Sequence, residues 1–494
     1  MSNFLSDKET DFAFAMDTIE PTTSMDSAVN TRPLLQKSES DSDFDEDPIA
    51  IRKEGIDEEI DIKDTRPLFN NWEPADRYQI GYIIFYILGT VILLPWFFFI
   101  TAEEYWMYKF RPLSANVTIT ENGRSELQAS FTSYMTLAAT VPSTLFLIIN
   151  PLINHKISLN VRMHGSLVTM LILFIVTTVF VKVDTDHWQE EFFLVTLGIV
   201  ILLNIASAIL QSAVFGVVGR FPSKYIAGTM RGLALGGIIA ATAKIVSLFV
   251  GASPAISALA YFIMADAFIV ISILAYMFLA STLFFKFHCE ELPRHGSIQY
   301  EPVHTVEKPS SPIIRDISYT AILKKIWVHG MSLWYCFVVM FTVYPAVTVL
   351  IKSTTVGNPT WTDVYFVPVV TFLLYSVCDY LGRIISAYLT ISEKRTWWIA
   401  SISLARTGFI PLIMLCNAQP RQHLPVLFNY DTIYIVIMIA FGLSNGYLAN
   451  LTFISVPKIV ASHEQEVAST MLAAFLGVGI ACGSIISLLI VTLL

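Results

Sequence analysis

The chain has 494 residues, of which 54% are hydrophobic and only 14% are charged. Soluble domains carry about 25% charged residues, so this composition excludes an ordinary soluble protein and indicates lipid as the main solvent. The net charge of −9 is unevenly placed, because residues 1–76 hold 20 Asp and Glu against seven Lys and Arg. Outside short loops there is no basic patch, so nucleic-acid binding is not expected.

The predicted elements begin with an acidic tail, residues 1–76. Its stretch "SESDSDFDEDP" (Ser38–Pro48) is poor in apolar residues and rich in charge, which predicts disorder. The tail shows no apolar h-region, so no cleavable signal peptide is expected. Leu34 and Leu35 in "TRPLLQ" resemble a dileucine sorting signal that would bind sorting adaptors, although Asn30 stands where an acid is expected. A chance pair of leucines is the alternative.

Eleven apolar stretches follow, each long enough to cross a bilayer as a helix of roughly 20 residues. They lie near residues 80–101, 131–152, 164–182, 192–218, 226–250, 256–286, 326–351, 364–390, 397–417, 431–456 and 466–493. An odd number places the two termini on opposite faces. The loops on the N-terminal side carry 13 Lys and Arg and the opposite loops carry six, so the N-terminus is predicted to be cytosolic.

The loops suggest how the chain is divided. A polar segment rich in Pro and Ser separates six spans from five, an arrangement in which many secondary transporters place a site between two bundles. The predicted parts are a cytosolic tail (1–76), a six-helix bundle (77–287), a cytosolic linker (288–325) and a five-helix bundle (326–494). The sequon at Asn116 falls in the first loop on the non-cytosolic side, where glycosylation is expected.

Motifs of the common enzyme chemistries are absent. The sequence contains no GxxxxGK[ST], HExxH or GxSxG pattern, which excludes P-loop ATP-driven pumps, zinc proteases of the HExxH type and hydrolases with a nucleophile elbow. The five cysteines have no metal-ligand spacing. We therefore expect a protein that is not an enzyme and that needs neither a metal nor a cofactor.

Polar residues at membrane depth are the candidate site, because they are costly and by default functional. Asp379 and Arg383, in "VCDYLGRIISAYL", lie one helical turn apart in the eighth span. Either they line a water-filled region, with Arg383 donating to a polar substrate, or they form an ion pair that only locks helices together. Gln211, in "ILQSAVFG", either reads the edge of a heterocycle, since an amide both donates and accepts, or makes an interhelical hydrogen bond.

Two further segments carry candidate residues. Trp96 follows a proline in "LLPWFFFITAEEYWMYKF" and lies deeper than an interfacial aromatic belt, so it could stack on a ligand ring. Asn445 lies among small residues in "FGLSNGYLANL" of the tenth span, as tight packing or helix unwinding near a site would require.

Lys244 and Asp266 are isolated charges in the fifth and sixth spans. Their depths from the same membrane face are roughly 9 and 15 Å, and the turn between the spans is short, so the two helices should be antiparallel neighbours. A pair is favoured over two lone charges, each of which would cost about 2.5–3.5 kcal/mol at mid-membrane. The pair could sense pH through Asp266; the alternative is a snorkelling lysine beside a protonated acid.

Taken together, these segments resemble the equilibrative nucleoside transporter family from about Asp76 onward. The matching stretches, in order, are "LLPWFFF", "ILQSAVFG", "YPAVTV", "CDYLGR", "MLCNAQPR" and "SNGYL" followed by "VPK". Three others, "VKVDTDHW", "ATVPSTL" and "ITAEEYWMYKF", look closest to the lysosomal, third member of the family. The resemblance implies an all-α membrane protein of eleven helices, in a variant of the major facilitator fold, that moves nucleosides passively in both directions.

The resemblance also implies roles for particular residues. Leu93 and Trp96 correspond to substrate contacts of the first helix, Gln211 to a contact with the base, Asp379 and Arg383 to a charged pair near the ribose, and Pro345 and Phe372 to an outer gate. The chain departs from the family pattern at Phe97 and Ser376, where asparagine is usual, at Thr140, often methionine, and at Ser207, usually glycine.

The sequence therefore predicts a facilitative nucleoside transporter that works by alternating access. Its partners would be nucleosides such as uridine and adenosine and the lipid bilayer of the plasma membrane or of late endosomes and lysosomes. Two alternatives remain open. One is a polyspecific carrier of nucleobases or organic cations such as monoamines from the same family, and the other is a membrane receptor that does not transport.

Overall fold

The computed structural model describes residues 74–112, 126–153, 156–251, 253–289, 318–355, 359–389, 396–419 and 425–493. All of these residues belong to the second of the two units into which the chain divides, Pro67–Leu494. Leu34, Leu35 and Asn116 lie outside the described residues, so the sorting signal and the glycosylation site stay predictions.

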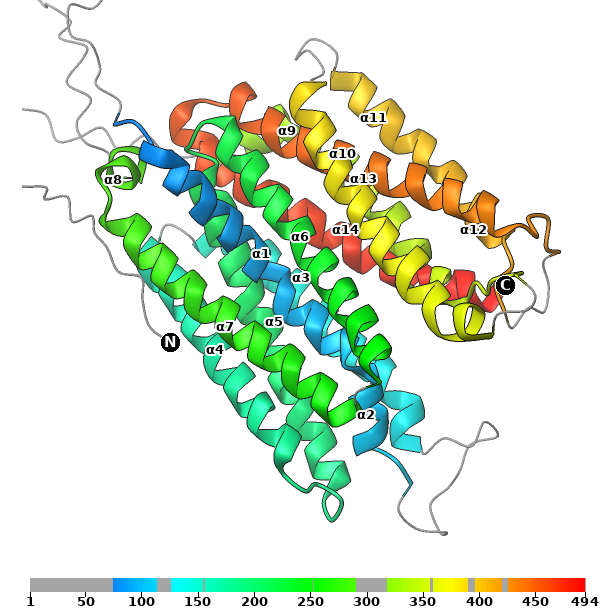
Figure 1. The fold of residues 1–494 in the computed structure, drawn as a ribbon. Coiled ribbons are helices and arrows are strands. Elements are labelled where there is room, and N and C mark those ends of the chain that lie inside the picture. The colour runs from blue at the N-terminus through cyan, green and yellow to red at the C-terminus, as the bar shows by residue number, and fades with distance from the viewer. Residues whose placement is uncertain are drawn as a thin grey trace, which may run out of the picture. The chain divides into compact units, whose positions relative to one another are not determined.

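The described part of the chain is built of helices (Figure 1). The first elements are η1 (Arg77–Gln79), α1 (Ile80–Thr101), α2 (Glu103–Lys109), α3 (Glu126–Ile153), α4 (Leu159–Lys182), α5 (Gln189–Val218), α6 (Ser223–Val250), α7 (Pro254–Ser281) and α8 (Leu283–Cys289). The later ones are α9 (Tyr319–Val343), η2 (Thr348–Leu350), η3 (Thr360–Tyr365), η4 (Val367–Leu374), α10 (Tyr375–Tyr388), α11 (Thr396–Ala405), η6 (Arg406–Gly408), α12 (Phe409–Met414), α13 (Asp431–Ile459), η7 (Ser462–Glu464) and α14 (Gln465–Leu493). Within the described ranges, 11 helical spans are long and apolar enough to cross a membrane. The predicted number of spans is therefore confirmed.

Two of the predicted spans are not continuous α-helices. The eighth is π-helical in η3 and η4 and becomes α-helical only at Tyr375. The ninth is interrupted by the 3-10 turn η6, which begins at Arg406 between α11 and α12. Hydropathy predicts the length of an apolar span but not its hydrogen-bond register, and π-helical turns are often found at functional sites.

The spans pack as long helix pairs. α6 lies along α1, α10 along α13 and α9 along α14, while α3 and α4 both pack against α5 (Figure 1). The α10–α13 contact is especially close, because a Cβ atom added to Gly382 would lie 2.2 Å from the Leu443 carbonyl oxygen and one added to Gly446 would lie 1.8 Å from that of Asp379. Only glycine at both positions lets these two backbones meet, and this contact positions the charged pair of α10.

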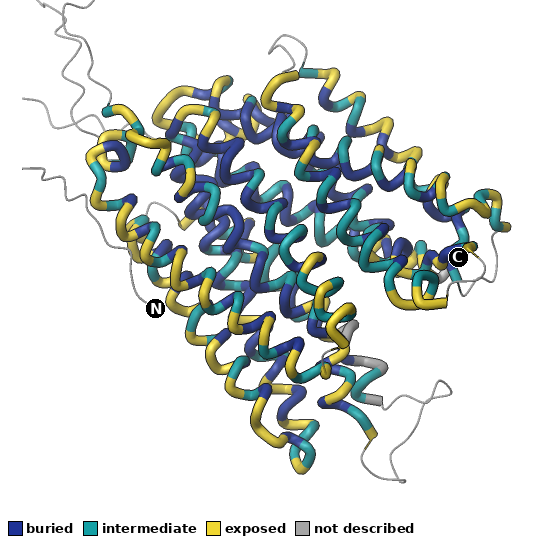
Figure 2. The backbone as a smooth tube through the Cα atoms, in the orientation of Figure 1, coloured by how far each residue is buried: buried dark blue, intermediate teal, exposed yellow. Residues whose placement is uncertain are grey.

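Apolar side chains cover the outward faces of the helices as well as the interior. Figure 2 shows exposed positions alternating with buried ones along α7. On this helix Phe262 and Ile269 are buried, whereas Ile263, Leu274 and Phe278 are more than half exposed. Exposing an apolar stripe of this kind to water would be costly, whereas the lipid chains of a bilayer can cover it. The described helices thus form a multi-pass membrane protein.

Candidate functional site

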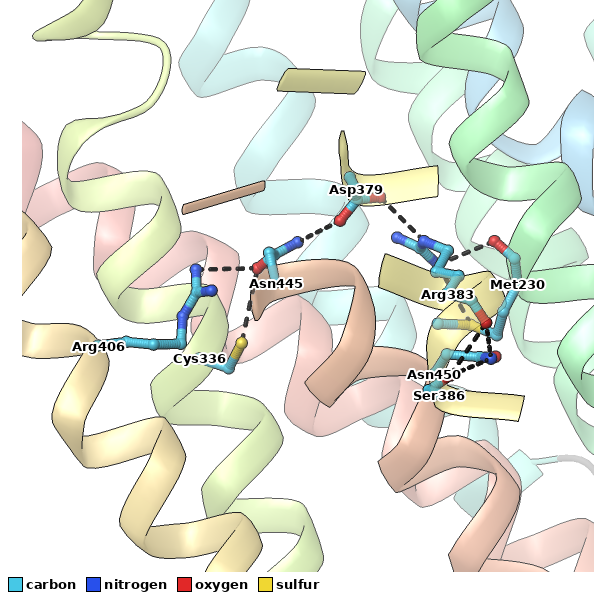
Figure 3. Close-up of polar contacts among 8 residues, drawn as sticks. All are labelled: Met230, Cys336, Asp379, Arg383, Ser386, Arg406, Asn445 and Asn450. Carbon is cyan, nitrogen blue, oxygen red and sulfur yellow. Dashed lines mark hydrogen bonds and ion pairs between the residues drawn. The ribbon is translucent and has the colours of Figure 1, made fainter. Parts of the chain in front are cut away.

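The charged pair of α10 is buried and connects two helices. Arg383 Nε donates to Asp379 Oδ2 at 2.9 Å, and both residues are at most 6% exposed (Figure 3). Arg383 Nη1 donates to the carbonyl oxygen of Met230, on α6, at 2.9 Å. Arg383 Nη2 donates to no described residue, and it is not among the polar atoms that are both unpaired and sealed from solvent. One face of the guanidinium therefore remains available to a ligand.

Asp379 is also part of a longer polar network. Its Oδ1 accepts a hydrogen bond from Asn445 Nδ2 on α13 at 2.7 Å, and Asn445 Oδ1 accepts one from Arg406 Nη2 at 3.2 Å (Figure 3). Sequence reasoning singled out Asn445 but missed Arg406. The signal was present, because a lone arginine in the apolar stretch "ISLARTGFI" is as costly at membrane depth as the pair itself.

Gln211, the predicted base contact, lies on α5 with an unpaired amide. The residue is only 5% exposed, yet its side chain makes no hydrogen bond to any described residue. Its amide atoms are not among those sealed from solvent. Water can pair with the amide in the absence of a ligand, so the position is suited to a ligand that displaces this water and supplies the same partners.

The first helix packs against α5 near Gln211. Ser207, one turn before Gln211, donates to the Ile92 carbonyl oxygen at 2.7 Å and so ties α5 to α1. Leu93 and Trp96, half-buried on the next turn of α1, therefore lie near the α5 end of the site. No hydrogen bond among the described residues joins them to the charged pair, so their role as substrate contacts remains a prediction.

Two of the positions that depart from the family pattern meet on α6. The ring of Phe97 on α1 and the hydroxyl of Ser376 on α10 both lie against Gly237. Ser376 is one turn before Asp379, so this contact brings the α1 segment that carries Trp96 next to the helix that carries the charged pair. The fold thus gathers segments of α1, α5, α6 and α10 that are far apart in the sequence.

The two predicted gate residues are linked through Tyr344, which precedes Pro345 in the chain and whose ring lies near that of Phe372. Pro345 is exposed and follows Tyr344 through a cis peptide bond. The Tyr344 ring lies 6.0 Å from that of Phe372 on η4 and stacks on Tyr375 at 4.2 Å, measured between ring centroids. Tyr344 thus brings the chain at Pro345 close to Phe372, while the role of the two residues as a gate remains a prediction.

The predicted ion pair between Lys244 and Asp266 is wrong. Lys244 Nζ donates to Glu104 Oε1 on α2 at 2.7 Å, and Asp266 Oδ2 accepts a hydrogen bond from the Thr178 hydroxyl on α4 at 2.9 Å. The reason is that α7 packs against α1 and α4, with α1 between α7 and α6 (Figure 1). The turn between α6 and α7 is short, but the two helices are not packing neighbours.

Near the N-terminal end of α1, polar contacts connect spans that precede the linker with spans that follow it. Tyr86 on α1 is hydrogen-bonded to Tyr380 on α10 at 3.1 Å. Glu466 on α14 forms ion pairs with Arg162 on α4 and with Arg220, which follows α5. Sequence reasoning counted these arginines only as loop charges and so missed the acid that binds them.

Among the described residues, no group of His, Cys, Asp and Glu could hold a metal ion.

Comparison with known proteins identifies the chain. A family model described as Nucleoside transporter matches residues 197–492. The chain belongs to the nucleoside transporter family. Human equilibrative nucleoside transporter 1 is 36% identical over 450 residues, which cover 84% of this chain and 98% of the relative. Human equilibrative nucleoside transporter 2 is 32% identical over 85% of this chain and 99% of its own length.

The third member of the family does not stand out among these relatives. Rat equilibrative nucleoside transporter 3 is 32% identical over 83% of this chain and 88% of its own length, so a special closeness to the lysosomal member stays a prediction. Among solved structures, the human organic anion transporter MFSD10 aligns with a TM-score of 0.49 at 10% identity, over 84% of this chain and 94% of that one. A TM-score below 0.5 does not establish a common fold, so the fold is defined by the described helices alone.

Proposed function

We propose that this chain is a facilitative nucleoside transporter, a carrier rather than an enzyme, which moves purine and pyrimidine nucleosides down their gradient by alternating access. Membership of the nucleoside transporter family supports the substrate class. The 11 apolar spans of the described residues support a carrier embedded in the bilayer. Neither observation requires a cofactor.

The unpaired amide of Gln211 is the observation that carries the proposal. A nucleobase edge presents a donor and an acceptor side by side, which is the complement of one carboxamide. The free Nη2 of Arg383 suits an acceptor such as a sugar hydroxyl. Both groups are unpaired among the described residues and open to a ligand, so a polar, heterocyclic and uncharged substrate would satisfy them together.

The same geometry disfavours an organic cation as the main substrate. A carrier for monoamines would need a carboxylate free to bind the ammonium group. Asp379 already accepts from Arg383 and from Asn445, and Arg406 is the next charge along the network. A cation would therefore have to displace Arg383 or Asn445 from Asp379, and the guanidinium of Arg383 would repel it.

Radiolabelled uridine uptake by the purified protein in proteoliposomes tests the proposal. We expect saturable uptake that follows the uridine gradient in either direction, needs no ATP and is inhibited by unlabelled adenosine more strongly than by serotonin. Protein-free liposomes are the control. No saturable uridine flux by folded protein would refute the proposal, and stronger inhibition by serotonin or adenine than by adenosine would favour the polyspecific carrier.

Several finer points belong to the proposal. The charge bias of the loops supports a cytosolic N-terminus. In this orientation Leu34 and Leu35 would be accessible to cytosolic sorting adaptors. Asn116 would lie on the other face, where glycosylation takes place. A plasma membrane or late endosomal and lysosomal location follows from the same signals. The two bundles predicted for residues 77–287 and 326–494 would be the bodies that rock around the site.

A further inference from the structure

The amide of Asn445 lies between the charged pair of α10 and a second buried arginine. Figure 3 shows the chain of contacts that runs from Arg383 through Asp379 and Asn445 to Arg406. Four helical segments meet there, because Arg383 also donates to the backbone of Met230 on α6. No other side chain described in the structure joins the pair to Arg406.

The orientation of the Asn445 amide is dictated by its neighbours. Its Nδ2 donates to a carboxylate oxygen of Asp379, while its Oδ1 accepts from Arg406 Nη2 and, at 3.5 Å, from Cys336 Sγ. Turning the amide over would place its oxygen against the carboxylate and its N–H groups against the guanidinium. Both contacts would then be repulsive, so the side chain has only one favourable orientation.

Arg406 has no acidic partner of its own among the described residues. It is 1% exposed and lies in the break between α11 and α12. Its Nη1 donates to the Phe441 carbonyl oxygen at 3.1 Å and to the Ser444 hydroxyl, and its Nε has no partner. The nearest carboxylate in this network is Asp379, and the charge of Arg406 reaches it through the Asn445 amide alone. Arg406 donates to three acceptors and lies over the Phe441 ring, but its buried charge has no carboxylate of its own, so the amide that links it to Asp379 helps to stabilise the arrangement.

We propose that Asn445, together with Arg406, is a positioning residue for transport. It occupies Oδ1 of Asp379, so the carboxylate presents only Oδ2 to Arg383, which keeps Nη2 of Arg383 aimed at the substrate. The proposal rests on the proposed nucleoside transport, since it assigns a role within that site. Asn445 itself is 1% exposed and acts through Asp379 rather than on the substrate.

Asn445→Asp is the sharpest variant, because it keeps the side-chain shape while it replaces the donor with an acceptor and adds an ionisable group. The new carboxyl would lie at the position of Nδ2, 2.7 Å from Asp379 Oδ1. Two ionised carboxylates at this distance repel each other, although Arg406 would compensate the new charge in part, and one proton shared between them restores the missing donor. The ionisable groups that face this point from the packed elements are Arg383, Tyr375, Cys378, Arg406, Cys336 and Tyr344. None of these side chains ordinarily titrates between pH 5.5 and 7.5.

Uridine flux is measured in proteoliposomes with the same pH on both sides, relative to wild type at each pH. The uridine flux of Asn445→Asp should be at least about tenfold below that of wild type at pH 7.5, as expected when a charge-assisted hydrogen bond becomes a repulsion. At pH 5.5 most of this flux should be recovered. Asn445→Leu is the matched control, since it lacks both the donor and the acid. It should be impaired equally at both pH values.

Thermal stability of the detergent-purified protein gives a second readout that does not depend on transport. Asn445→Asp should be destabilised at pH 7.5 and stabilised by acidification. The exchange Asp379→Asn with Asn445→Asp restores one acid and one amide between the two arginines, and should regain wild-type stability without pH dependence. Wild-type flux in Asn445→Asp at pH 7.5, or identical pH behaviour of Asn445→Asp and Asn445→Leu, would overturn the proposal. If wild type itself carries no uridine, the proposed function fails, and the stability measurements still decide the role of Asn445.

Discussion

Replacing Arg383 with lysine separates the charge of this residue from its geometry. Arg383 makes two charge-assisted hydrogen bonds, each of 2.9 Å, to Asp379 and to the Met230 carbonyl oxygen. Lysine keeps the positive charge but has a single nitrogen at the end of a flexible stem. It can retain the bond to Asp379, which leaves the carboxylate paired, and it then loses the bond to α6 and the free donor Nη2.

The structure sets the size of the expected effect. A hydrogen bond to a charged group contributes about 1.5–3 kcal/mol, and each 1.4 kcal/mol corresponds to about a factor of ten. Arg383→Lys should therefore lower the efficiency of uridine transport roughly 10- to 150-fold. Its abundance in the membrane should fall much less than its flux, because the bond to the Met230 carbonyl oxygen is lost but no buried carboxylate is left unpaired.

The assay is uridine uptake over a range of concentrations in proteoliposomes, normalised to the amount of reconstituted protein. Lys325→Gln is a suitable control, since it breaks a 2.7 Å ion pair with Glu464 near the protein surface, and such pairs contribute about 0–1 kcal/mol. The control should transport like wild type. Full transport by Arg383→Lys would show that the pair is only structural, and an equal fall in abundance and flux would assign the effect to folding.

Three further outcomes are expected. Gln211→Leu keeps the approximate volume and removes the amide, so the apparent affinity for uridine and adenosine should fall about tenfold; unchanged affinity for both would exclude a contact with the base. Gly446→Ala places a methyl group 1.8 Å from a backbone carbonyl oxygen of α10 and should abolish the monodisperse peak in size-exclusion chromatography, whereas normal elution would contradict the close helix contact. In a double-mutant cycle on thermal stability, Lys244→Met should couple to Glu104→Gln by up to about 1 kcal/mol and be additive with Asp266→Asn. Coupling to Asp266 instead would restore the ion pair predicted from the sequence, and a wild-type pH profile of transport in Asp266→Asn would exclude that residue as a pH sensor.

The sequence by itself determined the membrane architecture and singled out the charged pair of α10 as the leading candidate for the site. Eleven apolar spans are visible in the hydropathy because each must fill the hydrocarbon core by its own composition, independently of its neighbours. The cost of charge in that environment singles out Asp379 and Arg383, whose pairing needs only the geometry of one helix. The motifs around these residues were sufficient to indicate the family.

Contacts between helices were decided only by the tertiary structure. Helical periodicity says which residues share a face of one helix, but not which helix that face meets or at what rotation. Lys244 and Asp266 were therefore paired through a short turn, whereas α1 lies between their helices and Glu104 on α2 reaches the lysine instead. The link from Asp379 to Arg406 was equally invisible, because it depends on α13 approaching α10 closely enough for one asparagine to contact both charges.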